Sequence, residues 1–231
     1  MGETEQDSPG MQSFQFPVPT PRDSWHIVVV GAMDPRQHNP FWYKVIGAIT
    51  DNEAKKTQGF ATPIQVQFSI LEFTVQCSTS RWEISTHSEN NLSRIEQVTE
   101  KVFQKLSEVP VQAFGINTAI HADTKAKEVR MILSKILLED DLGFPDSDER
   151  DCSIHYIAGN SKDLTTSITI GQSTMAPNKV GVDYNRQHVI RGTGGYFDLG
   201  PEIRKHTRAD WGAAGDFAAK LAARINFLAG D

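Results

Sequence analysis

Cysteine is scarce in this chain, which has only Cys77 and Cys152 among its 231 residues. Two cysteines supply neither the disulfide framework of a small secreted domain nor the thiolates of a structural zinc site. Each lies in a strand-like run, so we interpret both as buried thiols of a protein from a reducing compartment. Cys152 and His155 lack a second ligand pair and would lie on opposite faces of a strand. The sequence therefore predicts no metal site.

Long apolar runs are also missing. No segment approaches the ~18 apolar residues of a membrane-spanning helix, and the start of the chain, MGETEQDSPGMQS, has no apolar signal-peptide core. Positive charge is in deficit, because 23 Lys and Arg residues face 29 Asp and Glu, for a net charge of −6. This balance argues against a nucleic-acid partner, whose binding surface needs a basic excess. We expect a cytoplasmic protein that does not enter a membrane.

Complete catalytic motifs are absent as well. The chain has no Gly-x-Ser-x-Gly elbow, no His-Glu-x-x-His helix and no Gly-Lys-Ser/Thr phosphate loop. The acidic run at 139–151 lacks the spacing of a calcium-binding loop and is interpreted as a solvated linker. We therefore expect no cofactor, and whether the protein is an enzyme stays open, with the balance against catalysis.

What the chain does contain is a succession of strand and helix patterns. Alternating or continuous apolar runs predict strands at 25–32, 64–77, 82–84, 111–122, 152–158, 165–173 and 179–190. Apolar residues at helical spacing predict helices after Asn39-Pro40, from 90 or 91 to before Pro110 and around 129–137. A last helix is predicted from about Asp210, as its N-cap, to the end, with a buried stripe that includes Trp211, Ala214 and Ala218. Hairpins followed by helices predict an α+β fold with a mainly antiparallel sheet, helices on one face and a long C-terminal helix.

Two local patterns qualify this layout. Within 64–77 the alternation changes phase between Ile70 and Leu71, which predicts a β-bulge or a strand that changes the layer it faces. The polar stretch TDNEAKKTQG, at 50–59, predicts a loop or a frayed helix end.

The predicted organisation is an arm followed by one domain. Residues 1–23 are first polar and then apolar and proline-rich, as in FQFPVPTP, which fits a flexible tail or an arm that docks on a partner. In the docking interpretation, Phe14, Phe16 and Val18 share one side of an extended segment. We expect residues 24–231 to form a single α+β domain. A loose likeness between its two parts suggests two similar halves, split near 139–151.

The stretch IVVVGAMDPRQHNPFW, at 27–42, is similar to a motif of the nucleotidylyltransferases. In that family a strand leads into Gly-x-Phe-Asp-Pro-x-His-x-Gly-His, and the chain matches it at Gly31, Asp34 and Pro35. The resemblance implies histidines that contact nucleotide phosphates, on a doubly wound parallel sheet. His38 falls one residue late, however, and the second histidine is missing.

The same residues have a simpler interpretation. Asp34 and Pro35 suit a turn, and Asn39 followed by Pro40 suits the start of a helix. Asp34 and His38 then remain as two polar groups at the end of a strand, and both are candidates for ligand binding.

Positive charge concentrates on both sides of the glycine-rich stretch RGTGGYFDLG at 191–200. Arg186, His188 and Arg191 are its ligand-binding candidates, and a second basic group follows at 204–208. Such a cluster can bind a phosphate, a carboxylate or an acidic partner face. The second group is explained equally well as solvent-exposed residues that lead into the last helix. His26, Asn117 and His121 lie in or beside strands, where they line a pocket or serve as ordinary core and edge residues.

Two functions remain. The first is a non-enzymatic protein-interaction subunit of a larger cytosolic assembly, with Phe14, Phe16 and Val18 against a protein partner. The alternative is a small-ligand binding protein or enzyme that holds a phosphate or carboxylate with the basic cluster at 186–208 and uses Asp34 and His38 as acid–base groups. The sequence carries no signal of the oligomeric state.

Overall fold

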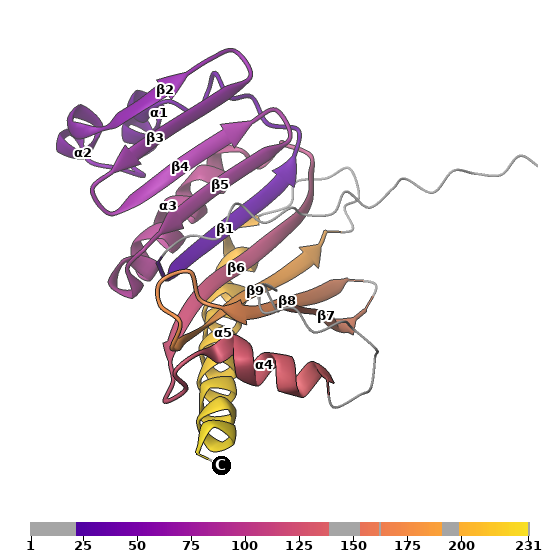
Figure 1. Ribbon diagram of the computed structural model, residues 1–231. Coiled ribbons are helices and arrows are strands. Elements are labelled where there is room, and N and C mark those ends of the chain that lie inside the picture. Colours follow the sequence, from indigo (N-terminus) through magenta and orange to yellow (C-terminus); the bar gives the residue numbers. More distant parts are fainter. Residues whose placement is uncertain (1–21, 139–152, 162, 191–198, 231) are drawn as a thin grey trace, which may run out of the picture.

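The computed structural model describes residues 22–138, 153–161, 163–190 and 199–230. Within these ranges, nine strands form a single sheet in the order β2-β3-β4-β5-β1-β6-β9-β8-β7, and every neighbouring pair is antiparallel (Figure 1). The strands are β1 Ser24–Gly31, β2 Gln58–Ala61, β3 Gln65–Ile70, β4 Phe73–Ser78, β5 Arg81–Thr86, β6 Val111–Asp123, β7 Ser153–Asn160, β8 Leu164–Gln172 and β9 Lys179–Val189. The predicted α+β fold with a mainly antiparallel sheet is confirmed.

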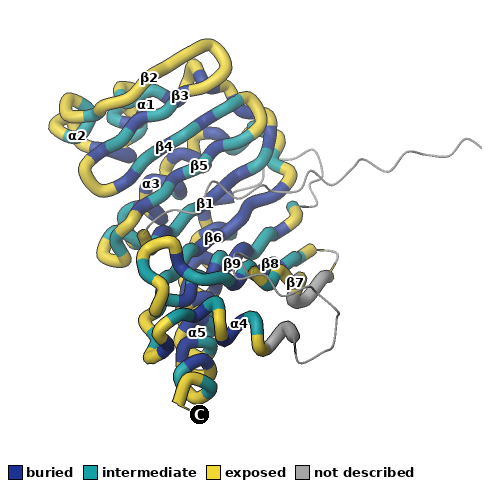
Figure 2. Tube along the Cα trace, viewed as in Figure 1, coloured by how far each residue is buried: buried dark blue, intermediate teal, exposed yellow. Residues whose placement is uncertain are grey.

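The helices supply the second layer. They are α1 Pro40–Val45, α2 Asp51–Lys56, α3 Leu92–Lys105, α4 Val129–Leu138 and α5 Leu199–Ala229, with a 3-10 turn at Glu89–Asn91. The long helices α3 and α5 lie behind the sheet in Figure 1, and α5 contacts both α3 and the central strand β6. The buried segments in Figure 2 run along the strands and the inner sides of these helices.

The core lies between the helices and one face of the sheet. One apolar cluster joins β1 and β3–β6 to α1 and α3, with Trp82 against Phe103 at a ring separation of 5.1 Å. A second cluster joins β8 and β9 to α4 and the C-terminal part of α5. On the other face, which we call the polar face, register aligns Gln67, Gln76 and Glu83 in one row across β3, β4 and β5. Two similar halves stay a prediction, and the proposed split at 139–151 lies outside the described residues.

Two local expectations were wrong in detail. The phase change at Ile70 and Leu71 marks a hairpin turn and not a β-bulge, because Ile70 pairs with Phe73 and Leu71 is 90% exposed in the turn between them. The stretch predicted as a loop or frayed helix end instead holds α2 and β2. A capping box begins α2: Thr50 Oγ1 accepts from the Glu53 amide at 3.2 Å, and Glu53 Oε2 accepts from the Thr50 amide.

The start of the last helix was also predicted wrongly. The predicted start was about Asp210, read as an N-cap, but α5 begins at Leu199 and takes Pro201 in its first turn, where the missing amide hydrogen costs nothing. The basic residues at 204–208 continue this helix. Asp210 is therefore an interior residue, and its side chain turns toward the sheet. The predicted buried stripe of the helix is confirmed by Trp211, Ala214 and Ala218.

Some expectations fall outside what the structure describes. Phe14, Phe16 and Val18 belong to residues 1–21, whose placement is not described, so the docking arm stays a prediction. None of the described helices has both the length and the apolar character needed to cross a membrane.

The end of β1 packs closely against the backbone just before β6, and a substitution of Gly31 tests this contact. A Cβ added there would lie 2.4 Å from the carbonyl oxygen of Pro110, so we expect Gly31→Ala to lower the free energy of unfolding by about 1–3 kcal/mol. Gly212→Ala is the matched control. Nothing lies within 4 Å of that Cβ on the exposed side of α5, and helix propensity should raise the free energy of unfolding by about 0.5–1 kcal/mol. Urea denaturation that shifts both variants in the same direction would contradict this packing.

Candidate functional site

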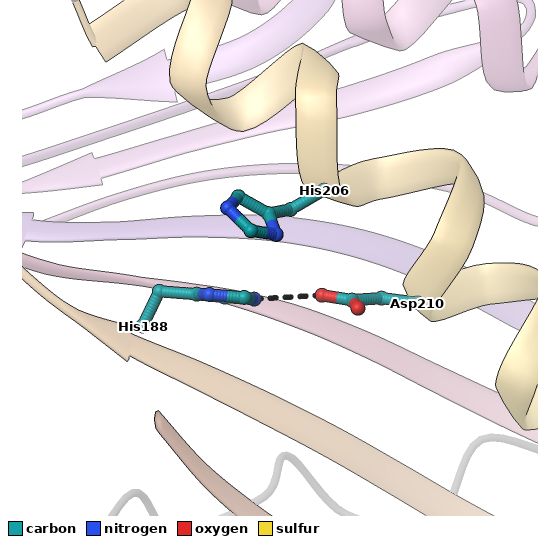
Figure 3. Close-up of side chains that lie close together, drawn as sticks. All are labelled: His188, His206 and Asp210. Atoms are coloured by element: carbon teal, nitrogen blue, oxygen red, sulfur yellow. Dashed lines mark hydrogen bonds and ion pairs between the residues drawn. The ribbon is translucent and has the colours of Figure 1, made fainter. Parts of the chain in front are cut away.

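The candidate site lies where the end of β9 meets α5. Arg186 and His188 are two residues apart on β9, so both side chains reach the helix-covered face of the sheet. His206 and Asp210 are four residues apart on α5, which brings them to one side of the helix. Figure 3 shows His188, His206 and Asp210 converging from these two elements.

Asp210 is the centre of the site. Its side chain is only 1% exposed, and each carboxylate oxygen has its own partner on β9. Arg186 Nη1 donates to Oδ1 at 2.7 Å, and His188 Nε2 lies 2.7 Å from Oδ2. A carboxylate this deeply buried is tolerated only because both oxygens are paired. The pairing therefore ties the middle of α5 to the sheet.

The two histidines are held by different neighbours. The ring of His188 stacks on Phe114, with 4.6 Å between ring centres and planes 8° apart. The ring of His206 lies 4.2 Å from that of His188, and its Nε2 lies 3.3 Å from Glu202 Oε1. Burial and then the neighbouring His188 lower the pKa of His206, while Glu202 and Asp210 act in the opposite direction. His188 is the more rigid of the two, since it is buried and stacked.

The chemistry of the site follows from its donor atoms. One ligand atom each from His188, His206 and Asp210 lie within 4.8 Å of one another. Two imidazoles and a carboxylate are donors that divalent transition metals accept. Among the described residues, neither histidine bonds to a serine, threonine or cysteine side chain, so the arrangement does not assemble a nucleophile with its base.

The basic cluster predicted at 186–208 is electrostatically compensated. Besides Arg186 and His188 on Asp210, the following pairs occur on or beside α5: Lys205 and His206 with Glu202, Arg204 with Glu100 at 3.5 Å, and Arg208 with Glu96 at 3.7 Å. Each described cation of the cluster thus has a carboxylate neighbour, and little net positive charge is left for an anion. The phosphate or carboxylate site stays a prediction, and Arg191 lies outside the described residues.

Asp34 and His38 lie in the loop between β1 and α1. Asp34 is exposed and forms a two-pronged ion pair with Arg36, whose hydrogen bond lowers the pKa of that carboxyl. His38 is 1% exposed and bonds to Tyr43. Neither residue shares a hydrogen bond with Arg186 or His188. The structure therefore brings two of the five predicted ligand-binding residues together and gives Asp34 and His38 local partners.

His38 belongs to a buried hydrogen-bond chain. Trp82 Nε1 can only donate, and it donates to the Tyr43 hydroxyl oxygen at 2.7 Å. The Tyr43 hydroxyl also shares a hydrogen bond with His38 Nδ1, 3.0 Å away, whose direction is set by the tautomer of the ring. Burial lowers the pKa of His38 to about 4, so the ring is neutral at pH 7.

His206 and Asp210 were not identified as site residues from the sequence. Their spacing of four residues was visible, but the basic residues around His206 resembled a solvated helix entry and Asp210 resembled an N-cap. What the sequence does not contain is the crossing of α5 over β6 and β9, which brings both side chains to His188.

The neutral His38 should make stability depend on pH. Its pKa in the folded protein, about 4, lies below the ordinary 6.5, so the unfolded chain takes up the proton first as pH falls. The stabilisation is complete above pH 6.5 and is lost between pH 6.5 and 4, by roughly 3 kcal/mol. We expect His38→Gln, which does not titrate, to show a flatter stability profile over this interval in denaturant titrations. Parallel profiles for the two proteins would contradict the buried neutral ring.

No protein-family model matches the chain, and no curated protein matches it.

Proposed function

We propose that the protein binds a divalent transition-metal ion through His188, His206 and Asp210. The observation that carries this proposal is the convergence of three potential ligand atoms, within 4.8 Å of one another, from a strand and a helix. Three protein ligands leave coordination positions open for water or a small molecule. The proposal departs from the sequence-based expectation of no metal, because that expectation considered only ligands close together in sequence.

The surroundings of Asp210 support this function. Arg186 occupies Oδ1 and leaves Oδ2 directed toward His188, so the guanidinium orients the carboxylate from behind the cluster. Ligating carboxylates are commonly oriented by such hydrogen bonds, and the loss of an orienting partner weakens metal binding. The stack on Phe114 similarly limits rotation of the His188 ring. His188 and Asp210 are thus positioned before any ion binds, and the ion would replace the proton that lies between His188 Nε2 and Asp210 Oδ2, which is released to solvent.

His206 supplies the movement that closes the site. With metal–ligand bonds of about 2.0–2.2 Å, the ligand atoms around one ion stand roughly 3–3.5 Å apart. The present spread of up to 4.8 Å requires one side chain to move inward. The His206 side chain is 30% exposed, against 11% for His188 and 1% for Asp210. A rotation of His206 is therefore the expected response to the ion.

Cobalt(II) provides the direct test, because its visible absorption reports ligand type and geometry. After dialysis against a chelator, the full chain should bind one equivalent of Co²⁺, with absorption bands that Zn²⁺ abolishes by competition. His206→Gln should weaken binding by about tenfold or more, since it removes one of three protein ligands. Its thermal midpoint without metal should stay close to that of the parent chain, because the side chain is partly exposed.

His155→Gln is the matched control. His155 is an exposed histidine on β7, bonded to Thr169 and separate from the cluster, so its loss should leave Co²⁺ binding unchanged. Equal Co²⁺ binding by the parent, His206→Gln and His155→Gln proteins would refute the proposed site, as would no binding by the parent chain.

A second candidate function is the protein-interaction subunit predicted from the sequence. It is favoured by apolar side chains that stay exposed at the β2 end of the sheet, where Figure 2 shows a continuous exposed stretch. Phe41 and Val45, one turn apart on α1, are 67% and 65% exposed, and Phe60 on the edge strand β2 is 49% exposed. We propose that an extended apolar segment of a partner protein adds to β2 and covers these side chains.

Substitution of one exposed aromatic side chain distinguishes specific docking at β2 from non-specific hydrophobic association. Phe60→Lys, on the edge strand, should remove a partner that co-purifies with the full chain from its native cell. Phe227→Lys replaces a 63% exposed phenylalanine on α5 and should leave that partner bound. Deletion of residues 1–23 tests the arm separately. A partner lost equally from both phenylalanine variants, or retained by both, would contradict docking at β2.

A further inference from the structure

A second cluster of polar side chains lies on the polar face of the sheet, opposite α3 and α5. Ser24 and His26 are two residues apart on β1, so they share this face, while the neighbouring Ile27 lies in the core on the other side. Glu83 belongs to the same face on β5, which pairs with β1 (Figure 1). We call Ser24, His26 and Glu83 the Ser24 cluster.

Both ring nitrogens of His26 are engaged within the Ser24 cluster. Nδ1 lies 2.7 Å from Glu83 Oε1, and Nε2 lies 3.0 Å from Ser24 Oγ. An ionised carboxylate can only accept a hydrogen bond, so Nδ1 carries a proton. In the neutral ring Nε2 then has none and accepts the hydroxyl hydrogen of Ser24. A hydroxyl is thus placed on a nitrogen that can take its proton, with a carboxylate behind the same ring.

Arg81 holds the carboxylate of Glu83 in this position. Its Nε and Nη2 both donate to Glu83 Oε2, at 3.1 and 2.7 Å, which leaves Oε1 for His26. Burial raises the pKa of Glu83, but the hydrogen bonds and charges of His26 and Arg81 outweigh it, and the net shift is downward. Glu83 is therefore ionised at neutral pH and can stabilise the protonated ring that forms when His26 takes a proton.

The Ser24 cluster lies below the surface. Ser24 is 0% exposed, and the side chains of His26 and Glu83 are 13% and 12% exposed. Electrostatic interactions are stronger where water is largely excluded. The same burial restricts access, so a substrate must be small and must enter when the neighbouring segments open locally. Ala119 stands directly opposite Ser24 on β6, so the side chain next to the hydroxyl on that strand is a single methyl group.

We propose that the Ser24 cluster hydrolyses small carboxylic esters. Ser24 Oγ attacks the carbonyl carbon while its proton passes to His26 Nε2, and the bond to the alcohol oxygen breaks as the alcohol leaves with that proton. Water then attacks the acyl group on Ser24 and gives a proton to His26, which returns it to Ser24 Oγ as the acid departs. Ester and water thus become acid and alcohol. Ser24 and His26 are the catalytic residues, and Glu83 is a positioning residue.

Covalent labelling is the first test, because it reports the nucleophile directly. Diisopropyl fluorophosphate is added to the full chain with a chelator present, and Ser24 Oγ should displace fluoride from phosphorus. Peptide mass spectrometry should find the label on Ser24 in the parent chain and no label at this position in Ser24→Ala. Ser173 is the internal comparison: its Oγ lies 2.7 Å from His121 Nδ1, but it also accepts from the Met175 amide and has a role in a turn. It should stay unlabelled.

Two variants with retained thermal midpoints test the other members of the Ser24 cluster. His26→Gln removes the base and should slow labelling of Ser24 by about 100-fold. Glu83→Gln keeps the shape and removes the charge. With p-nitrophenyl acetate as substrate it should lower kcat by about tenfold or more and leave KM within about twofold, since it acts through His26.

The control variants separate this activity from exposed imidazoles and from the proposed metal site. His155 is exposed and bonds to the Thr169 hydroxyl, so His155→Gln should hydrolyse p-nitrophenyl acetate like the parent chain. His206→Gln should do the same, because none of the Ser24 cluster belongs to the metal site. A parent chain unlabelled at Ser24, a label on Ser173 instead, or equal labelling of the parent and His26→Gln proteins would overturn the proposal.

Discussion

The pairing of Asp210 with Arg186 and His188 is the interaction on which this structure depends most. It places a carboxylate with 1% exposure between the last helix and the central part of the sheet. A buried charge is stable only when its partners are present, so the position of α5 along β9 is restricted to the one that aligns Asp210 with both side chains. The same restriction brings His206, one turn earlier on the helix, against His188. The candidate metal site is therefore a consequence of how the helix is anchored.

Charge pairing also decides which ligands this region favours. A cluster that appears strongly basic in sequence becomes nearly neutral once Glu96, Glu100, Glu202 and Asp210 are placed beside it. An anion would have to displace these carboxylates. A divalent metal ion would instead use one of them as a ligand, with Arg186 as the partner that holds it.

Much of the fold followed from local patterns. Asn39 and Pro40 begin α1 as predicted, and the Asn39 side chain accepts a hydrogen bond from the Trp42 amide at 3.0 Å. The alternation of apolar and polar residues predicted the antiparallel sheet, because a strand with one buried face and one polar face repeats every two residues. The hairpin turn at Leu71 was misread because a tight turn and a bulge both shift that period by one residue. The start of α5 was misread because a buried aspartate and a capping aspartate are identical in sequence.

The candidate site was only half visible for a similar reason. Arg186 and His188 share a strand face, and their alternation can be recognised without a structure. Their partnership with Asp210 depends on a helix that crosses the sheet, which no local pattern records. His38 illustrates the opposite limit, since its position after a strand resembled a phosphate-binding loop, whereas its bond to Tyr43 makes it a neutral core residue.

The position of a bound metal ion tests the central claim most directly. Crystals of the full chain loaded with one equivalent of zinc should show a single strong anomalous peak, measured at the zinc absorption edge, between α5 and β9. The peak should lie about 2.0–2.2 Å from one nitrogen each of His188 and His206 and from one oxygen of Asp210. A peak elsewhere, or no peak between α5 and β9 with Asp210 still paired to His188, would contradict the proposed site.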